Sequence, residues 1–219
     1  MTRQVHTLVT SALALAVFTI APPVFAGPPL LCHPFDIGTA RSLPWDGKAG
    51  WSHEKADYKL DNLISDTEAL LTPSTPVVVR METLRRASLY ASRNPQVAKE
   101  LLGRLTARAE ASEAGGHPDG LALLDAAYVT EAFREIASLG GPEFAGRASG
   151  VRAAIGNADG YALISRSISA RPDDPAIQFA AALIAADKNR GRYSDHATKA
   201  RAGAARDPLL ARNLSLVGH

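Results

Sequence analysis

The sequence predicts an all-α protein whose helices stack as antiparallel hairpins, and three observations support this class. From residue 57 onward, apolar side chains recur three and four positions apart, which is the spacing of one helical face. A capping residue followed by proline recurs, as in Asn94-Pro95 and Asp207-Pro208, and this pair is typical of a helix start. No segment supports a β-strand. Helices with a single apolar stripe cannot bury it alone, so we expect each to pack against neighbours.

The first 26 residues have the features of a secretory signal peptide. Arg3 gives a basic start, residues 8–21 are apolar and uncharged, and a cleavage site is expected after Ala26. The apolar run is shorter than the roughly 20 residues that a spanning helix needs, and Pro22-Pro23 would end such a helix. We therefore expect a secreted or periplasmic protein with no stable membrane span after cleavage.

The composition fits one domain, or two closely packed halves, without disulfides. Cleavage after Ala26 would leave 193 of the 219 residues, which is enough for a substantial core. The remaining 23 basic and 22 acidic residues give a net charge of +1, so neither nucleic acid nor an anionic membrane is indicated as a partner. A single cysteine excludes an internal disulfide, and stability must come from helix packing.

An irregular strap, residues 27–56, is expected to precede the helical domain, residues 57–219. The strap is rich in proline and glycine and shows no helical or alternating period. It contains the two tryptophans of the chain, Trp45 and Trp51. Because large aromatic side chains are costly to leave in water, we expect both to anchor the strap against the helices.

Six to eight helices are expected in the helical domain. The first follows an apolar stripe from Leu60 to Leu71. Thr75-Pro76 is expected to cap and open the second, and Asn94-Pro95 the third, which ends at Gly115-Gly116. A fourth starts at 117–119 and ends at 140–142. Later helices are expected at 144–155, at 161–168, in an alanine-rich segment after Asp173-Asp174-Pro175, at 194–205 after a turn at 191–193, and from Asp207-Pro208 to Leu214.

The last two proline corners are spaced like a known repeat. Pro175 and Pro208 lie 33 residues apart, close to the period of about 34 in tetratricopeptide repeats. Residues 177–208 resemble one degenerate unit of that repeat, because four residues fall roughly at its packing positions: Leu183, Gly191, Tyr193 and Ala200. The resemblance implies a curved α-solenoid that holds a peptide or a partner protein on its concave face, and a scaffold more often than an enzyme.

Cys32-His33 is the one pair of residues with metal-ligand or redox chemistry. A thiolate and an imidazole both bind zinc or copper, and Asp36 or His53 could complete a site. The spacing matches no standard metal motif, and no cysteine-hydrolase signature surrounds the pair. The simpler interpretation is that Cys32 is a small buried hydrophobic residue.

Several arginines are candidates for binding carboxylates of a partner, because the guanidinium fork suits bidentate pairing. Acidic residues are interleaved with them, at Glu82, Glu100 and Glu110, so an ordinary charged surface is the alternative. The candidates are Arg80, Arg85, Arg86, Arg104 and Arg108.

Other polar residues have simpler explanations. Glu131 and Glu135 lie four residues apart on a predicted helix, where like charges typically mark a solvated face. His117 precedes a proline at a helix start, and His196 is expected to make a surface hydrogen bond.

No catalytic or cofactor motif is recognised, and no cofactor is predicted. We expect an exported, non-catalytic helical scaffold that binds a peptide or protein partner. One alternative is an envelope metal or thiol-redox protein that uses Cys32 and His33, and a second is a hydrolase whose site carries no recognisable motif.

Overall fold

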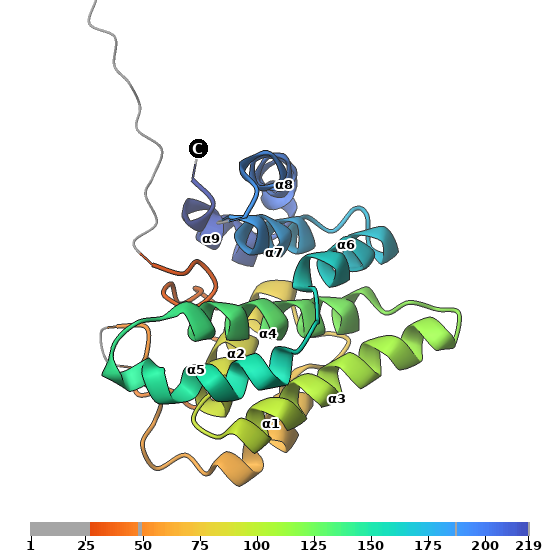
Figure 1. Ribbon diagram of the computed structural model, residues 1–219. Helices are drawn as coiled ribbons and strands as arrows, with labels where there is room; N and C mark the ends of the chain where they lie inside the picture. The colour runs from red at the N-terminus through yellow and green to blue at the C-terminus, as the bar shows by residue number, and fades with distance from the viewer. Residues whose placement is uncertain (1–26, 48–49, 187, 219) are drawn as a thin grey trace, which may run out of the picture.

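The computed structural model describes residues 27–47, 50–186 and 188–218, and these form an all-α fold (Figure 1). The predicted signal peptide lies outside these residues. Nine α-helices are present in the described residues, more than the six to eight expected, because residues 144–155 form a full helix although Gly146 and Gly150 interrupt their apolar pattern. They are α1 (Leu63–Leu70), α2 (Val77–Ala91), α3 (Pro95–Ala114), α4 (Gly120–Ser138), α5 (Pro142–Ile155), α6 (Gly160–Ala170), α7 (Pro175–Ala185), α8 (Arg190–Gly203) and α9 (Pro208–Asn213).

Three helices form the interior of the molecule. α4 contacts α2, α3, α5, α6 and α7, which makes it the central helix. α2 and α7 also contact each other. Every residue of α7 after Pro175 is buried, so the prediction that this alanine-rich helix is covered on more than one side is confirmed.

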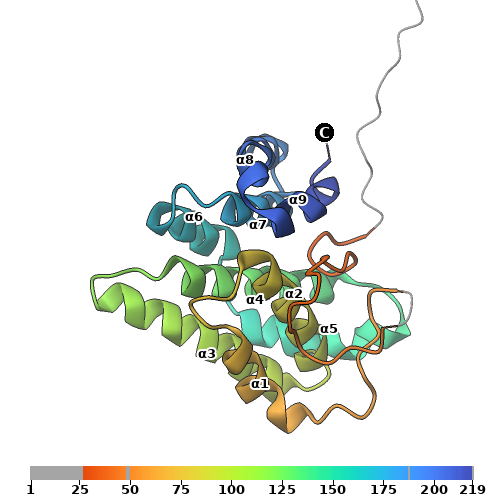
Figure 2. The same cartoon turned by 180° about the vertical axis from the view of Figure 1, so that it is seen from behind.

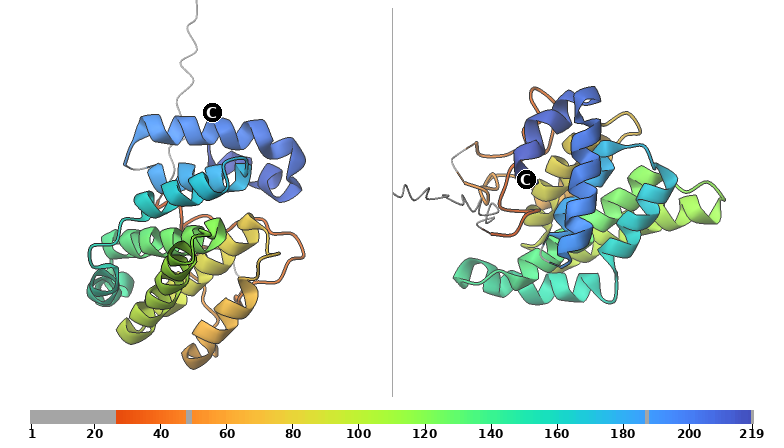
Figure 3. Two further views of the ribbon diagram at one scale, coloured as in Figure 1. Left: turned by 90° about the vertical axis from the view of Figure 1, so that its right-hand side faces the viewer. Right: turned by 90° about the horizontal axis from the view of Figure 1, so that it is seen from above.

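The helices are arranged in two tiers (Figure 3). α1 to α5 form the lower tier in the view of Figure 1, and α6 to α9 form the upper tier. α6 and α7 rest on α4, which joins the tiers through a single continuous core. Among the described residues, no helix is both long enough and apolar enough to cross a membrane.

Glycines at two helix starts allow α4 and α6 to lie antiparallel at close range. A Cβ on Gly120 would lie 3.2 Å from the carbonyl oxygen of Ser167, and a Cβ on Gly160 would lie 2.9 Å from that of Ala127. The Ser167 hydroxyl donates a hydrogen bond to the Gly120 carbonyl at 2.6 Å. Larger side chains at either glycine would separate the two tiers.

The strap begins where the two tiers meet and then runs down the side of the lower tier to α1 (Figure 2). It has no helix or strand of its own over residues 27–47 and 50–56, yet it contributes to the core. Four of its apolar side chains are buried: Leu30, Leu31, Phe35 and Leu43.

Phe35 of the strap is wedged between the tiers. Its ring lies edge-on to Tyr128 of α4 and to Phe179 of α7, with centroid distances of 6.5 and 6.0 Å. The next residue is tied to α9, because the Asp36 N–H donates to Asn213 Oδ1 at 2.8 Å and Asn213 Nδ2 donates to the Asp36 carbonyl at 2.9 Å. The strap therefore connects α4, α7 and α9.

Most of the predicted helix caps are confirmed. The side chains of Asn94, Asp174 and Asp207 each accept hydrogen bonds from two backbone N–H groups in the first turn of α3, α7 and α9. Asp119 does the same for α4. In three of these helices, proline occupies the first turn, where its missing N–H costs no hydrogen bond.

Two predicted boundaries are wrong. Pro76, not Thr75, occupies the N-cap of α2, and the Thr75 hydroxyl instead donates to the Leu70 carbonyl at 2.7 Å. The turn predicted at 191–193 lies inside α8, because the side chain of Asn189 caps that helix and it begins at Arg190.

Candidate functional site

A buried cluster of charges on α2 holds the strap in place. The Glu82 carboxylate accepts hydrogen bonds from Arg85 Nε at 2.8 Å, from Arg86 Nε at 2.7 Å and from the Phe35 N–H of the strap at 3.1 Å. Burial by itself raises the pKa of Glu82, but the hydrogen bond from Arg85 and the charges of Arg85 and Arg86 outweigh it, so this pKa lies below its ordinary value. Glu82 is therefore ionised at neutral pH.

The same two arginines bind carbonyl groups of the strap. Arg85 Nη1 donates to the carbonyls of Leu31 at 3.2 Å and Trp51 at 2.8 Å, and Arg86 Nη1 donates to that of Leu43 at 2.5 Å. An irregular segment has no helix or sheet to satisfy its backbone, and buried carbonyls must find donors elsewhere. The guanidinium groups of α2 supply those donors.

The side chains of the two strap tryptophans pack against the helices, and both are half-buried. Trp45 lies edge-on to Tyr90 of α2 at 5.8 Å, and the guanidinium of Arg85 sits 5.0 Å from the centre of its ring. Trp51 stacks on Phe144 of α5 with a centroid distance of 5.4 Å.

A second buried cluster joins α2, α3 and α4. Arg80 Nε donates to Asp125 Oδ1 at 2.8 Å, and Arg80 Nη1 donates to the Thr72 carbonyl at 2.6 Å. Arg108 of α3 donates to the same Asp125 carboxylate from the edge of the cluster. Asp125 is completely buried, and this burial raises its pKa although the hydrogen bonds and charges of the two arginines act in the opposite direction.

The five candidate arginines therefore occupy different places. Arg80 and Arg85 are buried and bonded inside the molecule, so neither lines an accessible surface. Arg86 is partly buried against the strap. Arg104 points outward, with a side chain 58% exposed and 3.7 Å from Glu100, and Arg108 is exposed over part of its length.

The prediction that Glu131 lies on a solvated face is wrong. Glu131 is buried and accepts a hydrogen bond from the Gly160 N–H at 3.1 Å, together with ion pairs from Arg134 and Lys188. It thereby connects α4 to the start of α6 and to the loop before α8. Glu135 is half-buried and accepts the Leu30 N–H of the strap at 3.1 and 3.2 Å.

Cys32 and His33 are half-buried in the strap. Burial and the nearby charge of Glu135 raise the pKa of the Cys32 thiol to about 11, with Arg85 acting in the opposite direction. Burial also lowers the pKa of His33. The thiolate is the form that attacks substrates and binds metals, and it is scarce at neutral pH with this pKa. Within the described residues, which include Asp36 and His53, no three His, Cys, Asp or Glu side chains are grouped to hold a metal ion.

His196 connects three helices of the upper tier. Its Nδ1 lies 2.7 Å from Gln178 Oε1 of α7, and its Nε2 lies 3.0 Å from the Tyr161 hydroxyl of α6. Burial, followed by the charge of Lys199, lowers the pKa of His196, so the ring is neutral at pH 7. His117 is exposed at the corner before α4.

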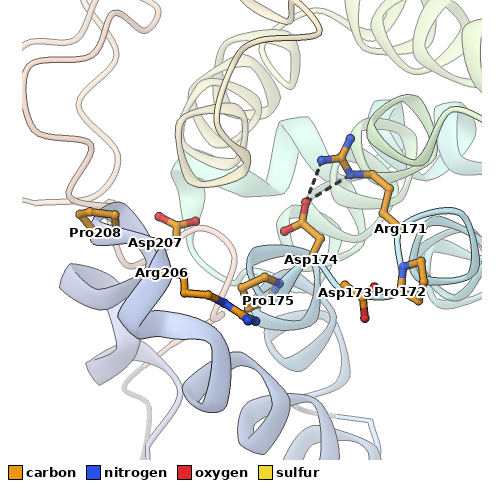
Figure 4. A pocket seen from close by; sticks show the side chains of 8 residues that line it. All are labelled: Arg171, Pro172, Asp173, Asp174, Pro175, Arg206, Asp207 and Pro208. Carbon is orange, nitrogen blue, oxygen red and sulfur yellow. Dashed lines mark hydrogen bonds and ion pairs between the residues drawn. The ribbon is translucent and has the colours of Figure 1, made fainter.

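Two proline corners of the upper tier border an open hollow of about 580 Å³ (Figure 4). One corner precedes α7 and the other precedes α9. A smaller hollow of about 220 Å³ shares Pro175 and Arg206 with the first and continues along α8 past Lys199 and Ala202. We call the two hollows together the corner groove. Its walls include Pro172, Pro175 and Pro208, and its charged residues include Arg171, Asp173 and Arg206.

The bottom of the corner groove is tightly packed. A Cβ on Gly203, at the end of α8, would lie 2.3 Å from Cβ of Pro175, so the two helices approach as closely as a glycine permits. The proline rings have fixed backbone φ angles. The backbone at the two corners therefore has little conformational freedom.

Comparison with known proteins finds no matching family model, no similar curated protein and no similar solved structure. The functional inference therefore depends on the residues and geometry described above.

Sequence reasoning identified the proline corners as helix starts but did not place them side by side. A signal was present, because the two Asp-Pro corners lie one repeat length apart. If consecutive repeats stack, their equivalent corners become neighbours. Nothing in the sequence marked Lys199 and Arg206 as residues of the groove, because isolated basic residues on a helix are ordinarily solvated.

Proposed function

We propose that this chain is an exported, non-catalytic helical scaffold whose corner groove binds a peptide segment of a partner protein. The corner groove is the observation that carries this proposal. Its rigid proline walls and exposed charges of both signs suit an extended peptide, which presents backbone and side-chain polar groups along its length. A deep apolar cavity would suit a small molecule better.

We also propose that α7, α8 and α9 form a tetratricopeptide-like unit within this scaffold. α8 pairs with α7, and α9 returns to contact α7. The Asp-Pro corners that open α7 and α9 are equivalent positions of such a unit. Repeats of this kind present neighbouring helices to a peptide, which agrees with a groove between those two corners.

The state of the buried acids supports a non-catalytic role. Glu82, Asp125 and Glu131 each accept hydrogen bonds from arginine or backbone groups, and all three are enclosed. A general acid or base has to reach a substrate proton from the wall of a cavity. These carboxylates hold helices and the strap together instead. Export rests on the predicted signal peptide.

A site-specific crosslinking experiment tests the proposal. A photoreactive amino acid replaces either Ala202, an exposed residue of the corner groove, or Ala153, an exposed residue of α5 in the lower tier. Each variant of the full chain is expressed in cells, irradiated, purified and examined by mass spectrometry. The two positions are matched in residue type and exposure, so they differ mainly in location.

We expect position 202 to crosslink reproducibly to a peptide segment of one other protein, while position 153 does not. Crosslinks to the same proteins at equal yield from both positions would contradict a specific groove. The absence of any crosslink from 202, with efficient crosslinking from 153, would move the binding surface to the lower tier.

A further inference from the structure

We infer that the strap is exchangeable between copies of this chain: the strap of one copy leaves its own helices and docks on the same helices of a second copy. Two chains then pair by exchanging straps. This inference goes beyond the proposed function, because the surface involved lies on α2, α4 and α9 and not at the corner groove. It follows from how the strap is bonded, what lies beneath it and what an opened chain exposes.

The strap backbone is bonded to the helices through helix side chains. Among the described residues, no backbone–backbone hydrogen bond joins residues 27–56 to a helix. The Tyr128 hydroxyl donates to the Leu30 carbonyl at 2.7 Å, and the Tyr90 hydroxyl donates to the Pro44 carbonyl at 2.8 Å. Other side chains bind the strap backbone in the same way, namely Glu82, Arg85, Arg86, Glu135 and Asn213. The helices therefore keep all of their own backbone hydrogen bonds when the strap leaves.

The charges beneath the strap are balanced within α2. Glu82 forms ion pairs with Arg85 and Arg86, which lie three and four residues further along the same helix. These ion pairs do not involve the strap, so they persist without it, and water can replace the strap carbonyls as partners of the guanidinium groups. An ionised face tolerates water, whereas an apolar helix face does not. The strap can therefore open at a lower cost than a buried helix such as α7.

An opened chain exposes two complementary surfaces. Its strap presents the apolar side chains that were buried, and its helices present the positions that held those side chains. One of these positions lies between Tyr128 and Phe179, where the Phe35 ring packs. The strap is the segment that fits this face, and a second copy carries an identical strap. Two opened chains can therefore recover every strap contact by exchange, in a symmetric dimer.

The protein concentration decides between the closed monomer and the exchanged dimer. Both forms contain the same strap contacts, so their free energies differ mainly through the tether that joins the strap to its own helices. A short flexible tether gives an effective concentration on the order of 1 mM. We therefore expect monomers at micromolar concentration and a substantial fraction of exchanged dimers near about 1 mM, once the straps have had time to open.

Hydrogen exchange of the full chain tests whether the strap opens by itself. The backbone N–H groups of Leu30, Phe35 and Asp36 donate to side chains of the helices, so docking protects them from exchange. Exchange is followed by NMR at several urea concentrations below the unfolding midpoint. These amides should exchange with a weaker urea dependence than the amides of α4, because strap opening exposes less surface than unfolding. An equal urea dependence would show that the strap leaves only when the whole protein unfolds, and would overturn the inference.

Isotope-mixed crosslinking tests the exchange itself. A photoreactive amino acid replaces Asp36, an exposed strap residue whose carboxylate lies 3.6 Å from Arg212 of α9. Unlabelled and isotope-labelled full chains are mixed in equal amounts, incubated in urea below the unfolding midpoint, returned to buffer and irradiated. Mass spectrometry then identifies the strap–α9 crosslinks that carry both isotope compositions, which form only between copies.

We expect mixed-isotope crosslinks to be about a quarter of all strap–α9 crosslinks after equilibration near about 1 mM, and at least about tenfold fewer near about 10 µM. The control is the same photoreactive amino acid at Ala153, an exposed residue of α5, which reports random encounters between copies. It should give few mixed-isotope crosslinks at either concentration.

The absence of mixed-isotope strap–α9 crosslinks near about 1 mM would overturn the inference, as would an equal yield of mixed-isotope crosslinks from position 153. A dimer without the strap–α9 crosslinks would place the contact between copies elsewhere and would also overturn it. None of these results bears on crosslinking to a partner at position 202, so strap exchange and the peptide site at the corner groove can fail separately.

Discussion

The strap side and the corner groove use the same kinds of charged residue in opposite ways. At the strap, Arg85 and Glu82 are completely buried, and their hydrogen-bonding atoms are directed at each other and at the strap backbone. At the corner groove, Lys199 and Arg206 are exposed and have no ion pair among the described residues. Burial thus distinguishes a charge that stabilises the fold from one that is available to a ligand. Substitutions on the two sides should separate stability from binding.

The largest effect is expected from Arg85→Ala. The substitution removes one partner of the buried Glu82 and the donor to two strap carbonyls, and breaking a buried pair from one side typically costs about 3–5 kcal/mol. Urea unfolding followed by circular dichroism measures the loss. Arg104→Ala on the exposed face of α3 is the control and should change stability by less than about 0.5 kcal/mol. Equal losses of stability in both variants would show that the buried Arg85 stabilises the fold no more than the exposed Arg104 does.

A smaller loss is expected from Trp45→Ala, about 2–3 kcal/mol. The substitution removes the packing on Tyr90 and the cation–π contact with Arg85, but Trp45 is only partly buried, so the cost should fall below that of a fully buried tryptophan. The thermal unfolding midpoint is the measurement. Trp45→Phe, which keeps an aromatic ring at this position, should recover part of the loss. A melting curve unchanged in Trp45→Ala would show that the strap is held without this anchor.

Acid should destabilise the strap side through protonation of Glu82. Because the pKa of Glu82 lies below its ordinary value of about 4.3, its contribution to stability is complete above that value and is lost as the pH falls through the lower, folded-state pKa. Stability measured between about pH 5 and pH 2 should therefore fall more steeply in the wild type than in Glu82→Gln, which cannot titrate at this position. Parallel pH curves for the two proteins would assign the acid sensitivity to other carboxylates.

The smallest effect on stability is expected at the corner groove. Lys199→Gln and Arg206→Gln alter exposed side chains without ion pairs in the described residues, so each should change the unfolding free energy by less than about 0.5 kcal/mol. The same urea experiment provides the comparison with Arg85→Ala. A loss of 2 kcal/mol or more, on the order of a buried contact, would mean that these residues support the fold after all.

Local sequence signals predicted the helices well because helix caps are local. Asp174 and Asp207 bond to N–H groups two and three residues ahead, so their role can be read from a few neighbouring letters. The error at Thr75 has a non-local cause. Its hydroxyl bonds to the Leu70 carbonyl at the end of the preceding helix, a contact that depends on how α1 and α2 meet.

The sequence by itself determined the all-α class, the proline corners and the irregular strap, since these depend on apolar spacing and on the backbone preferences of single residues. The tertiary structure decided which charges are inside. Glu82 meets the strap 47 residues away at Phe35, and Asp125 meets Arg80 across 45 residues, so no local pattern could mark them as buried. No local pattern marks the groove either, because its two corners are far apart in the chain and become neighbours only when α8 packs closely on α7. Burial is a property of the assembled helices and not of any one segment.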